Sequence, residues 1–356
     1  MRKSRPTVDL MTDTLVLCGS HSSPYSRKMR AVLRYRRIPH DWVIRGSRWD
    51  DLPDPPVPLI PILAWRDDNG EYRDLMVDSS PEISMLEEAF AGRSVVPADP
   101  ATAFLDFLLE DFGDEWVSKM MYHWRWANDV DAQKSGRILP LDRGLQIPDE
   151  YAAKAHEMFV SRQVSRRGLI GSSDNNAPVI EASYERTLDL LEAHLAHQDF
   201  FFGDRPGRSD FAVFGQLLPM LWWDPTPTAV GVDRAPRALM WVQWMDDLSW
   251  WRVEDDAAPW AAADAIADTT RALFAEAGRT YVPFMVANAE ALANGADEVV
   301  CEIDDVTFRQ GAFGYQGKCV QWIRDAYNAL ATVDRDRVDA VLEGTGCEML
   351  VHTRTI

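Results

Sequence analysis

Residues 14–35 decide the fold of this chain; they read TLVLCGSHSSPYSRKMRAVLRY. The stretch opens with apolar residues and continues with small ones, the pattern of a short buried strand. Ser and Pro follow, as they do where helices begin. The apolar residues after them keep helical spacing, with the charges on the opposite face. A strand that leads directly into a helix predicts an α/β domain at the start of the chain.

The next segments, residues 40–45, 59–65 and 66–77, continue this alternation. The first two predict strands, and the third predicts a hairpin with an Asn-Gly turn that leads into a fourth strand. Residues 78–90 place Ser and Pro before an apolar run with helical spacing, and they predict a helix with a serine cap at its start. This order of elements is typical of a thioredoxin-like domain, which we place at residues 14–93.

The sequence changes character on both sides of this domain. After it the strand signals nearly vanish, and residues 101–127 carry apolar side chains at steps of three and four, one stripe of a long helix. We therefore predict an all-helical domain over residues 94–290. Residues 291–356 predict a C-terminal extension with a short hairpin and one or two helices, packed on the helical domain. We interpret residues 1–13 as a flexible tail.

Composition excludes several classes of function. The chain has 356 residues and a formal net charge of −19, and such an acidic molecule repels nucleic-acid phosphates. No apolar run reaches the roughly 18 residues that a membrane span needs, and the basic first residues lack the apolar core of a secretory signal. The four cysteines show no spacing of a metal site or a disulfide framework. We expect a cytoplasmic protein without metal, membrane or nucleic-acid partner.

Three short motifs occur in the order and spacing of a known family. They are Ser23-Pro24-Tyr25 before the first helix, Ile60-Pro61 in the predicted third strand, and Asp78-Ser79 at the start of the second helix. These motifs resemble those of serine-type glutathione transferases, of the tau type and of bacterial β-etherase-like relatives. The resemblance implies a thioredoxin-like domain followed by an all-α domain, with glutathione as co-substrate. It also implies a homodimer and a role in detoxification.

By this resemblance, Ser23 is the residue that contacts the thiol of glutathione. Glutathione attacks electrophiles as a thiolate, and a free thiol has a pKa of about 8.5. A hydroxyl that donates a hydrogen bond to the sulfur favours the charged form, and the positive end of a helix dipole adds to this effect. Ser22 and Ser26 lie so close that the sequence leaves open which serine faces the thiol. Capping of the helix is compatible with either role.

The other two motifs would bind the rest of the tripeptide. In the family the proline is cis, so Pro61 would let the backbone of Ile60 pair with the cysteinyl part of glutathione. Asp78 would pair with the γ-glutamyl ammonium, and Ser79 and the helix N-terminus would bind its carboxylate. The ligand of the glycyl carboxylate stays unassigned, because Pro58 and Leu59 stand where tau-type relatives have a Lys. The nearby residues Arg45, Arg48 and Trp49 cannot be placed from the sequence.

The first long helix supplies the residues that we expect around a second substrate. An aromatic and partly polar wall is offered by Trp116, Met120, Tyr122, His123, Trp124 and Trp126, not all of which can point inward. Tyr25, within the serine motif itself, is a further candidate. An aromatic stripe at helical spacing is also the usual pattern of a packed core. A further departure is Gly207, where the family usually has a Ser or Thr helix cap, and Ser209 is the alternative cap.

We therefore expect attack of glutathione thiolate on a small hydrophobic electrophile. Two other classes of function stay open. One is a glutathione-dependent lyase, etherase or isomerase, which uses the same thiolate. The other is a non-catalytic binding or interaction protein, because a fold does not fix a function.

Overall fold

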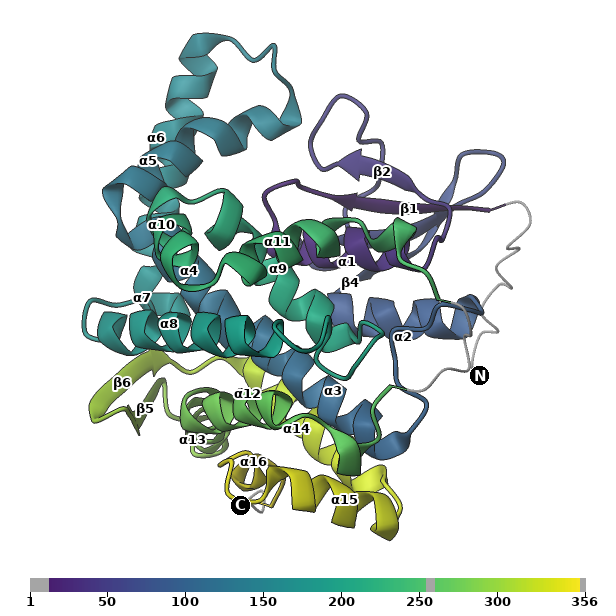
Figure 1. The fold of residues 1–356 in the computed structure, drawn as a ribbon. Coiled ribbons are helices and arrows are strands. Elements are labelled where there is room, and N and C mark those ends of the chain that lie inside the picture. Colours follow the sequence, from purple (N-terminus) through teal and green to yellow (C-terminus); the bar gives the residue numbers. More distant parts are fainter. Residues whose placement is uncertain (1–12, 254–259, 353–356) are drawn as a thin grey trace.

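The structure is a computed structural model that describes residues 13–253 and 260–352 (Figure 1). The expected flexible tail, apart from Asp13, lies outside the described residues. None of the described helices is long and apolar enough to cross a bilayer.

The N-terminal part is a four-stranded sheet in the order β2-β1-β3-β4. Its strands are β1 (Thr14–Gly19), β2 (Asp41–Ile44), β3 (Ile62–Arg66) and β4 (Tyr72–Val77). β2 runs parallel to β1, whereas β3 and β4 pair antiparallel. Helix α1 (Pro24–Tyr35) connects the parallel pair, and α2 (Ser79–Ala89) follows β4. This confirms the predicted thioredoxin-like domain.

Local capping explains where the two helices of this domain begin. The side chain of Ser23 accepts a hydrogen bond from the backbone N–H of Ser26 and caps α1. For α2 the sequence predicted a serine cap, but the cap is Asp78, whose carboxylate accepts from the N–H of Ser80 at 3.4 Å. Asp78 has φ 91°, which turns the chain sharply from β4 into the helix.

The described residues between 94 and 293 form helices and their connecting loops, as predicted. Its helices are α3 (Pro100–Phe112), α4 (Ser118–Ala127), α5 (Asp129–Ile138), α6 (Asp149–Ser165), α7 (Arg167–Ile170), α8 (Ala177–His194), α9 (Arg208–Trp222), α10 (Pro225–Arg234), α11 (Pro236–Asp246), α12 (Asp268–Arg279) and α13 (Tyr281–Ala293). A π-helical turn, η1 (Gly113–Val117), joins α3 to α4, and a 3-10 turn, η2 (Leu139–Arg143), follows α5. Together α5, η2 and α6 form an arm that projects at the top of Figure 1.

Helix α9 packs against α1, α3 and α4 at the centre of the molecule. A Cβ at Gly215 would lie 2.7 Å from the carbonyl oxygen of Pro24. The missing side chain therefore lets α9 approach the first turn of α1 and support it. This contact positions the loop that carries the serine motif.

The start of α9 differs from the prediction. Gly207 stands at the cap, but Ser209 does not replace the missing side chain. Instead the carboxylate of Asp106, on α3, accepts hydrogen bonds from the N–H groups of Arg208 and Ser209, each at 3.1 Å. A Cβ at position 207 would lie 2.3 Å from Asp106 Oδ1. The glycine is needed because the cap comes from another helix.

As far as residue 352, the C-terminal extension contains the predicted hairpin and three helices, where the sequence predicted one or two. They are β5 (Glu298–Ile303), β6 (Val306–Gly311), α14 (Gly314–Ala329), α15 (Thr332–Leu342) and α16 (Glu348–His352). α14 and α15 pack against α3, at the bottom of Figure 1. Arg337 of α15 pairs with Asp99, the N-cap of α3, at 2.7 Å.

One continuous hydrophobic core joins these parts. It contains buried residues of β1 and α1, of the central helices and of the extension as far as Val351. A small second cluster, which includes Cys18 and Ile62, covers the other face of the sheet. Strand β1 is thus buried on both faces, which explains its nearly unbroken apolar sequence.

Candidate functional site

A cleft of about 1050 Å³ lies between the N-terminal sheet and the arm. Residues 20 and 22–24, in the loop between β1 and α1, line its base. Residues 54, 55 and 58–60 form one wall, and α4, η2 and α6 form the opposite wall. The cleft therefore meets the serine motif on one side and the helical part on the other, as a two-substrate site requires.

The serines at the base of the cleft differ in what their hydroxyls do. Ser20 Oγ donates to Asp142 Oδ2 at 2.6 Å, so Ser22 Oγ must be the donor in its 2.7 Å contact with Ser20 Oγ. Ser26 is fully buried, and its oxygen accepts from the N–H of Ser20. Ser23 Oγ accepts from the N–H of Ser26 at 3.3 Å, and its own hydrogen has no acceptor among the described residues. Ser23 is thus the cleft-lining serine with a free O–H.

The N-terminus of α1 supplies a positive potential at this hydroxyl. Ser23 stands at the N-terminus of α1, where unpaired N–H groups and the helix dipole attract anions. The buried guanidinium of Arg125, from α4, donates to the carbonyl of Ser22 at 3.2 Å and to Asp224 at 2.9 Å. A thiolate held at Ser23 would therefore lie in a favourable potential.

Ile60 and Pro61 lie beside the serine motif, at the start of β3. The peptide bond between them is cis, as in the resemblance. Ile60 lines the cleft, and in residues 13–253 and 260–352 its N–H and C=O have no hydrogen-bond partner. A residue that lines the cleft thus has two backbone groups without a partner in the described part of the chain.

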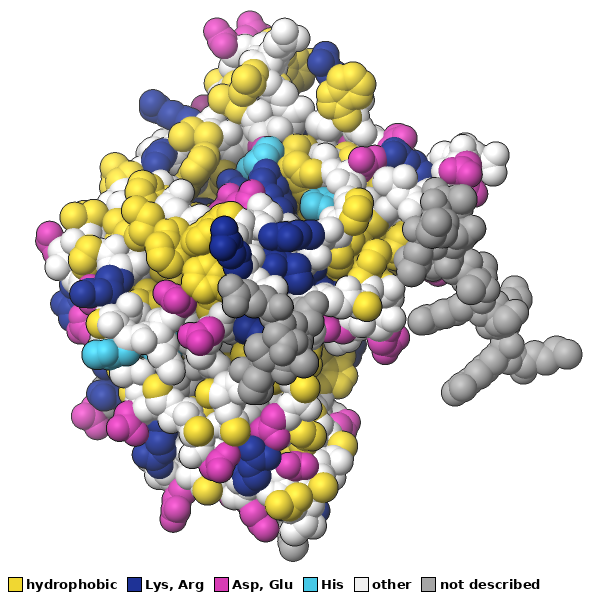
Figure 2. All heavy atoms as spheres, turned by 45° about the vertical axis from the view of Figure 1, so that its right-hand side comes forward, with side chains coloured by type: hydrophobic (Ala, Val, Ile, Leu, Met, Phe, Trp, Pro, Cys, Tyr) yellow, Lys and Arg dark blue, Asp and Glu magenta, His cyan; other side chains and the backbone are white. Residues whose placement is uncertain are grey.

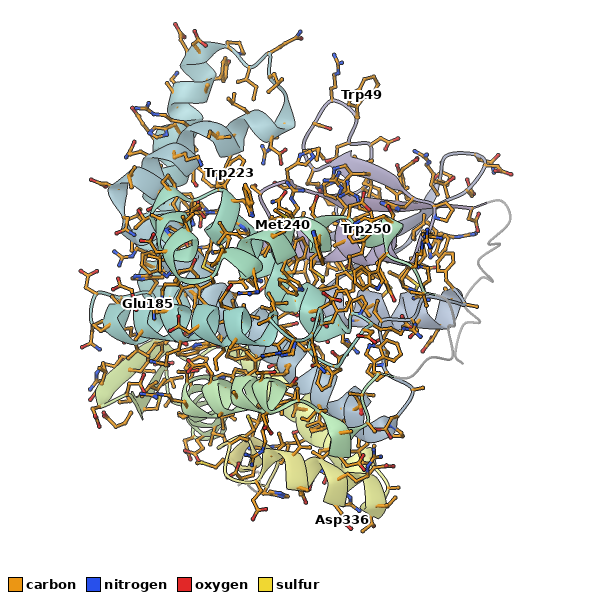
Figure 3. All side chains as sticks on the ribbon, in the orientation of Figure 1. Trp49, Glu185, Trp223, Met240, Trp250 and Asp336 are labelled. Carbon is orange, nitrogen blue, oxygen red and sulfur yellow. The ribbon has the colours of Figure 1, made fainter. Side chains whose placement is uncertain are left out.

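Of the three residues left unplaced by the sequence, Arg45 lines the same wall of the cleft. Its guanidinium is 3.1 Å from Asp50 and 2.6 Å from Asp54. Trp49 is 71 % exposed and projects from the loop after β2, away from the body of the protein (Figure 3). Arg48 packs over the Trp49 ring. Arg45 is therefore the one of the three that reaches the site.

Asp78 and Ser79 do not line the cleft. Asp78 Oδ2 accepts a hydrogen bond at 2.7 Å from the hydroxyl of Tyr315, on α14. Ser79 is buried, and its Oγ accepts at 3.1 Å from the ammonium of Lys28. Both residues stand at the N-terminus of α2, as the sequence predicted, but the protein already supplies them with partners. No sequence motif pointed to Tyr315 at this position.

Of the residues expected around the second substrate, those outside the cleft lining are Tyr25, Trp116, Met120, His123 and Trp124. Trp116 and Met120 are fully buried in the core. His123 is buried between Ser172 and Glu181, and burial lowers its pKa. Tyr25 donates to the carbonyl of Asp114 at 2.8 Å. The structure therefore does not place these side chains where a substrate in the cleft would contact them.

Comparison with known families decides the classification. The model described as "Glutathione S-transferase, N-terminal domain" matches residues 17–94. The model described as "Glutathione S-transferase, C-terminal domain" matches residues 150–252. The chain belongs to the glutathione S-transferase superfamily. A search of curated proteins finds no match.

Solved structures of the superfamily resemble this member distantly. A GST-like protein from Pseudomonas syringae is 16 % identical, with 65 % of this chain and 66 % of that chain covered and a TM-score of 0.42. The tau class transferase MiGSTU from mango, Mangifera indica, is 17 % identical over 65 % and 88 %, with a TM-score of 0.37. The β-etherase LigF from Sphingobium sp. strain SYK-6 is 19 % identical over 65 % and 98 %, with a TM-score of 0.36.

On α4 the cleft is lined by Met121, Tyr122, Arg125 and Trp126. The sequence had named Tyr122 and Trp126 for the wall of the second substrate site, but not Met121 or Arg125. They lie beside the stripe formed by Trp116 and Met120 rather than on it. An arginine between two tryptophans in an otherwise apolar helix was the available signal, because a buried charge requires a partner.

Among the described residues no group of three metal-ligating side chains exists.

Proposed function

We propose that this chain is a glutathione transferase in which Ser23 stabilises the glutathione thiolate for attack on a hydrophobic electrophile. The observation that carries the proposal is the free O–H of Ser23, at a helix N-terminus and in the wall of a large cleft. The hydroxyl of Ser22 donates to Ser20. Ser26 is fully buried and does not line the cleft. Cys18 does not compete for the role, because burial raises its pKa to about 12 and it lies inside β1.

The tripeptide would extend from Ser23 along the wall that Ile60 forms. The free N–H and C=O of Ile60 would pair with the cysteinyl backbone, next to Pro61. Arg45, on the same wall, is already paired with Asp50 and Asp54, so the ligand of the glycyl carboxylate stays unassigned. The γ-glutamyl end would approach Asp78 and Ser79, where Tyr315 and Lys28 already make contacts.

The chemistry at Ser23 is a substitution. The thiol of glutathione loses its proton to water, and the Ser23 O–H donates a hydrogen bond to the resulting thiolate. The sulfur then forms a bond to the electrophilic carbon, and the leaving group departs with the electron pair of the broken bond. Ether cleavage and isomerisation start from the same thiolate, so the acceptor decides among these reactions.

The pKa of the bound thiol tests the proposal, followed by ultraviolet thiolate absorbance. We expect it to lie below about 8.5 in wild type and to return towards that value in Ser23→Ala. Loss of one hydrogen bond to a charged group is worth about 1.5–3 kcal/mol, so kcat/KM should fall roughly 10- to 100-fold.

Ser22→Ala is the matched control, because that hydroxyl donates to Ser20 instead. It should keep the lowered thiol pKa. The proposal is contradicted if the thiol pKa stays low in Ser23→Ala, or if it rises in Ser22→Ala but not in Ser23→Ala.

A second function has one observation in its favour. Asp78 and Ser79 are engaged by Tyr315 and Lys28, an arrangement that suits a non-catalytic binding protein. If wild type fails to bind glutathione in a calorimetric titration, this function replaces the transferase. Homodimer formation, cytoplasmic location and a role in detoxification stay predictions; light scattering tests the first of them.

A further inference from the structure

Two of the arm's arginines line the cleft without an acidic partner among the described residues. Arg143, on η2, and Arg162, on α6, both line the cleft and are exposed. In the part of the chain that the structure describes, neither forms an ion pair. The other two arginines of the cleft are neutralised: Arg45 by Asp50 and Asp54, and Arg125 by Asp224.

The acidic residues of the cleft are also occupied. Asp54 pairs with Arg45. Asp142 accepts from the hydroxyl of Ser20 at 2.6 Å and contacts His21 Nδ1 at 2.6 Å. Neither carboxylate is therefore turned to the two arginines of the arm. The residues that line the cleft include four arginines and two aspartates, in a molecule whose net charge is −19.

The two arginines lie at different places along the cleft. The Nε of Arg143 would lie 3.1 Å from a Cβ at Gly46, so this side chain reaches from the arm to the end of β2. Arg162 lies close enough to Tyr122 to influence its pKa. Burial raises the pKa of Tyr122 to about 12, and the positive charges of Arg166 and Arg162 partly oppose this rise. One arginine thus stands at the mouth of the cleft and the other beside the aromatic wall.

The surface between the arginines is aromatic and apolar. Trp126 and Phe159 lie with ring centroids 5.8 Å apart, and Tyr122 and Trp126 with centroids 6.5 Å apart. Met121 and Met158 extend this wall. Flat rings and flexible thioether side chains fit an aromatic ligand.

We propose that the second substrate is an aromatic electrophile that carries a carboxylate or a similar anionic group. Its ring would lie on Tyr122, Trp126 and Phe159, and Arg143 and Arg162 would bind the anion, because a guanidinium matches a carboxylate in two parallel hydrogen bonds. The acidic side chains of the molecule are scattered over the face seen in Figure 2 rather than gathered in a patch. The identity of the reaction rests on the function proposed above, but the anion site does not.

The first test measures binding without glutathione. The fluorescent probes are 8-anilinonaphthalene-1-sulfonate and its uncharged counterpart N-phenyl-1-naphthylamine. We expect wild type to prefer the sulfonate and the double variant Arg143→Gln/Arg162→Gln to lower that preference about tenfold, since about 1.4 kcal/mol corresponds to a factor of ten. Arg137→Gln, an exposed arginine of the same arm outside the cleft lining, is the control and should keep the preference.

The second test measures kcat/KM with 1-chloro-2,4-dinitrobenzene and 4-chloro-3,5-dinitrobenzoate, which differ by one carboxylate. In both, the thiolate attacks the carbon that bears chlorine, and chloride leaves. We expect the benzoate to be preferred by wild type and the preference to fall about tenfold in the double variant, the same free-energy change as above.

The two proposals fail in different ways. Equal affinity of wild type for both dyes, or an unchanged preference in the double variant, overturns the anion site. A dye preference that depends on the arginines, together with no turnover of either chlorobenzene derivative, supports the anion site and counts against the transferase.

Discussion

Lys28 shows how one side chain fixes the first helix to the helical part. Its ammonium lies 2.7 Å from Glu110 and 2.6 Å from Asp114, and all three residues are buried. Burial alone would lower the pKa of Lys28, but the two carboxylates raise it above its ordinary value. The same ammonium donates to Ser79. Lys28 thus supports both the fold and the start of α2.

Replacement of Lys28 by Met should destabilise the protein by about 3–5 kcal/mol, the usual effect of removing one partner from a buried ion pair. Asp114 would remain buried without its main partner. Equilibrium unfolding in urea measures the change. Lys318→Met, at an exposed position of α14, should stay within about 0.5 kcal/mol of wild type. A similar small effect in both variants would contradict the structural role of Lys28.

The sequence predicted the serine motif, but it did not predict which of the serines has a free hydroxyl at the cleft. The hydroxyl of Ser22 is occupied because Ser20 donates to Asp142, which is 122 residues away along the chain. No local pattern reports such a contact. The motif was predictable because strand and helix signals are local, whereas the state of each hydroxyl depends on the arm.

At the scale of elements, helical spacing identified the core better than it identified the site. The stripe through Leu108, Phe112, Trp116 and Met120 is indeed a helix face, and all four are buried. The cleft is lined by the neighbouring face of α4, where Arg125 interrupts the apolar residues. An apolar stripe marks what a helix buries, so the substrate-facing residues lie at its border.

The contact between α12 and the C-terminal segment depends on Gly278. A Cβ at this position would lie 2.0 Å from the carbonyl oxygen of Thr345. Nearby, the thiol of Cys347 donates to the carbonyl of Phe274 at 3.1 Å. Any side chain at position 278 must displace this backbone.

Gly278→Ala should therefore destabilise the protein by about 1–3 kcal/mol, as overpacking of a close contact does, despite the better helix propensity of alanine. Thermal unfolding measures the change. Gly314→Ala, at the start of α14, is the control, because nothing lies within 4 Å of a Cβ there. If Gly278→Ala is as stable as this control, the C-terminal segment does not pack on α12 as described.

At the scale of the whole molecule, the order of motifs was enough to predict the fold class. The contacts of the extension were not predictable, since they join distant parts of the chain. Tyr315 reaches Asp78 across 237 residues, and Arg337 reaches Asp99 across 238. Both contacts join the extension to the N-termini of helices, α2 and α3. The extension thus packs on the same side of the molecule as the residues expected to bind the γ-glutamyl group.

The position of the glutathione sulfur tests the central claim most directly. A crystal structure of the protein with bound glutathione should place this sulfur within hydrogen-bond distance of Ser23 Oγ. The cysteinyl backbone should pair with Ile60. A sulfur held by another side chain, or glutathione bound outside the cleft, would contradict the account.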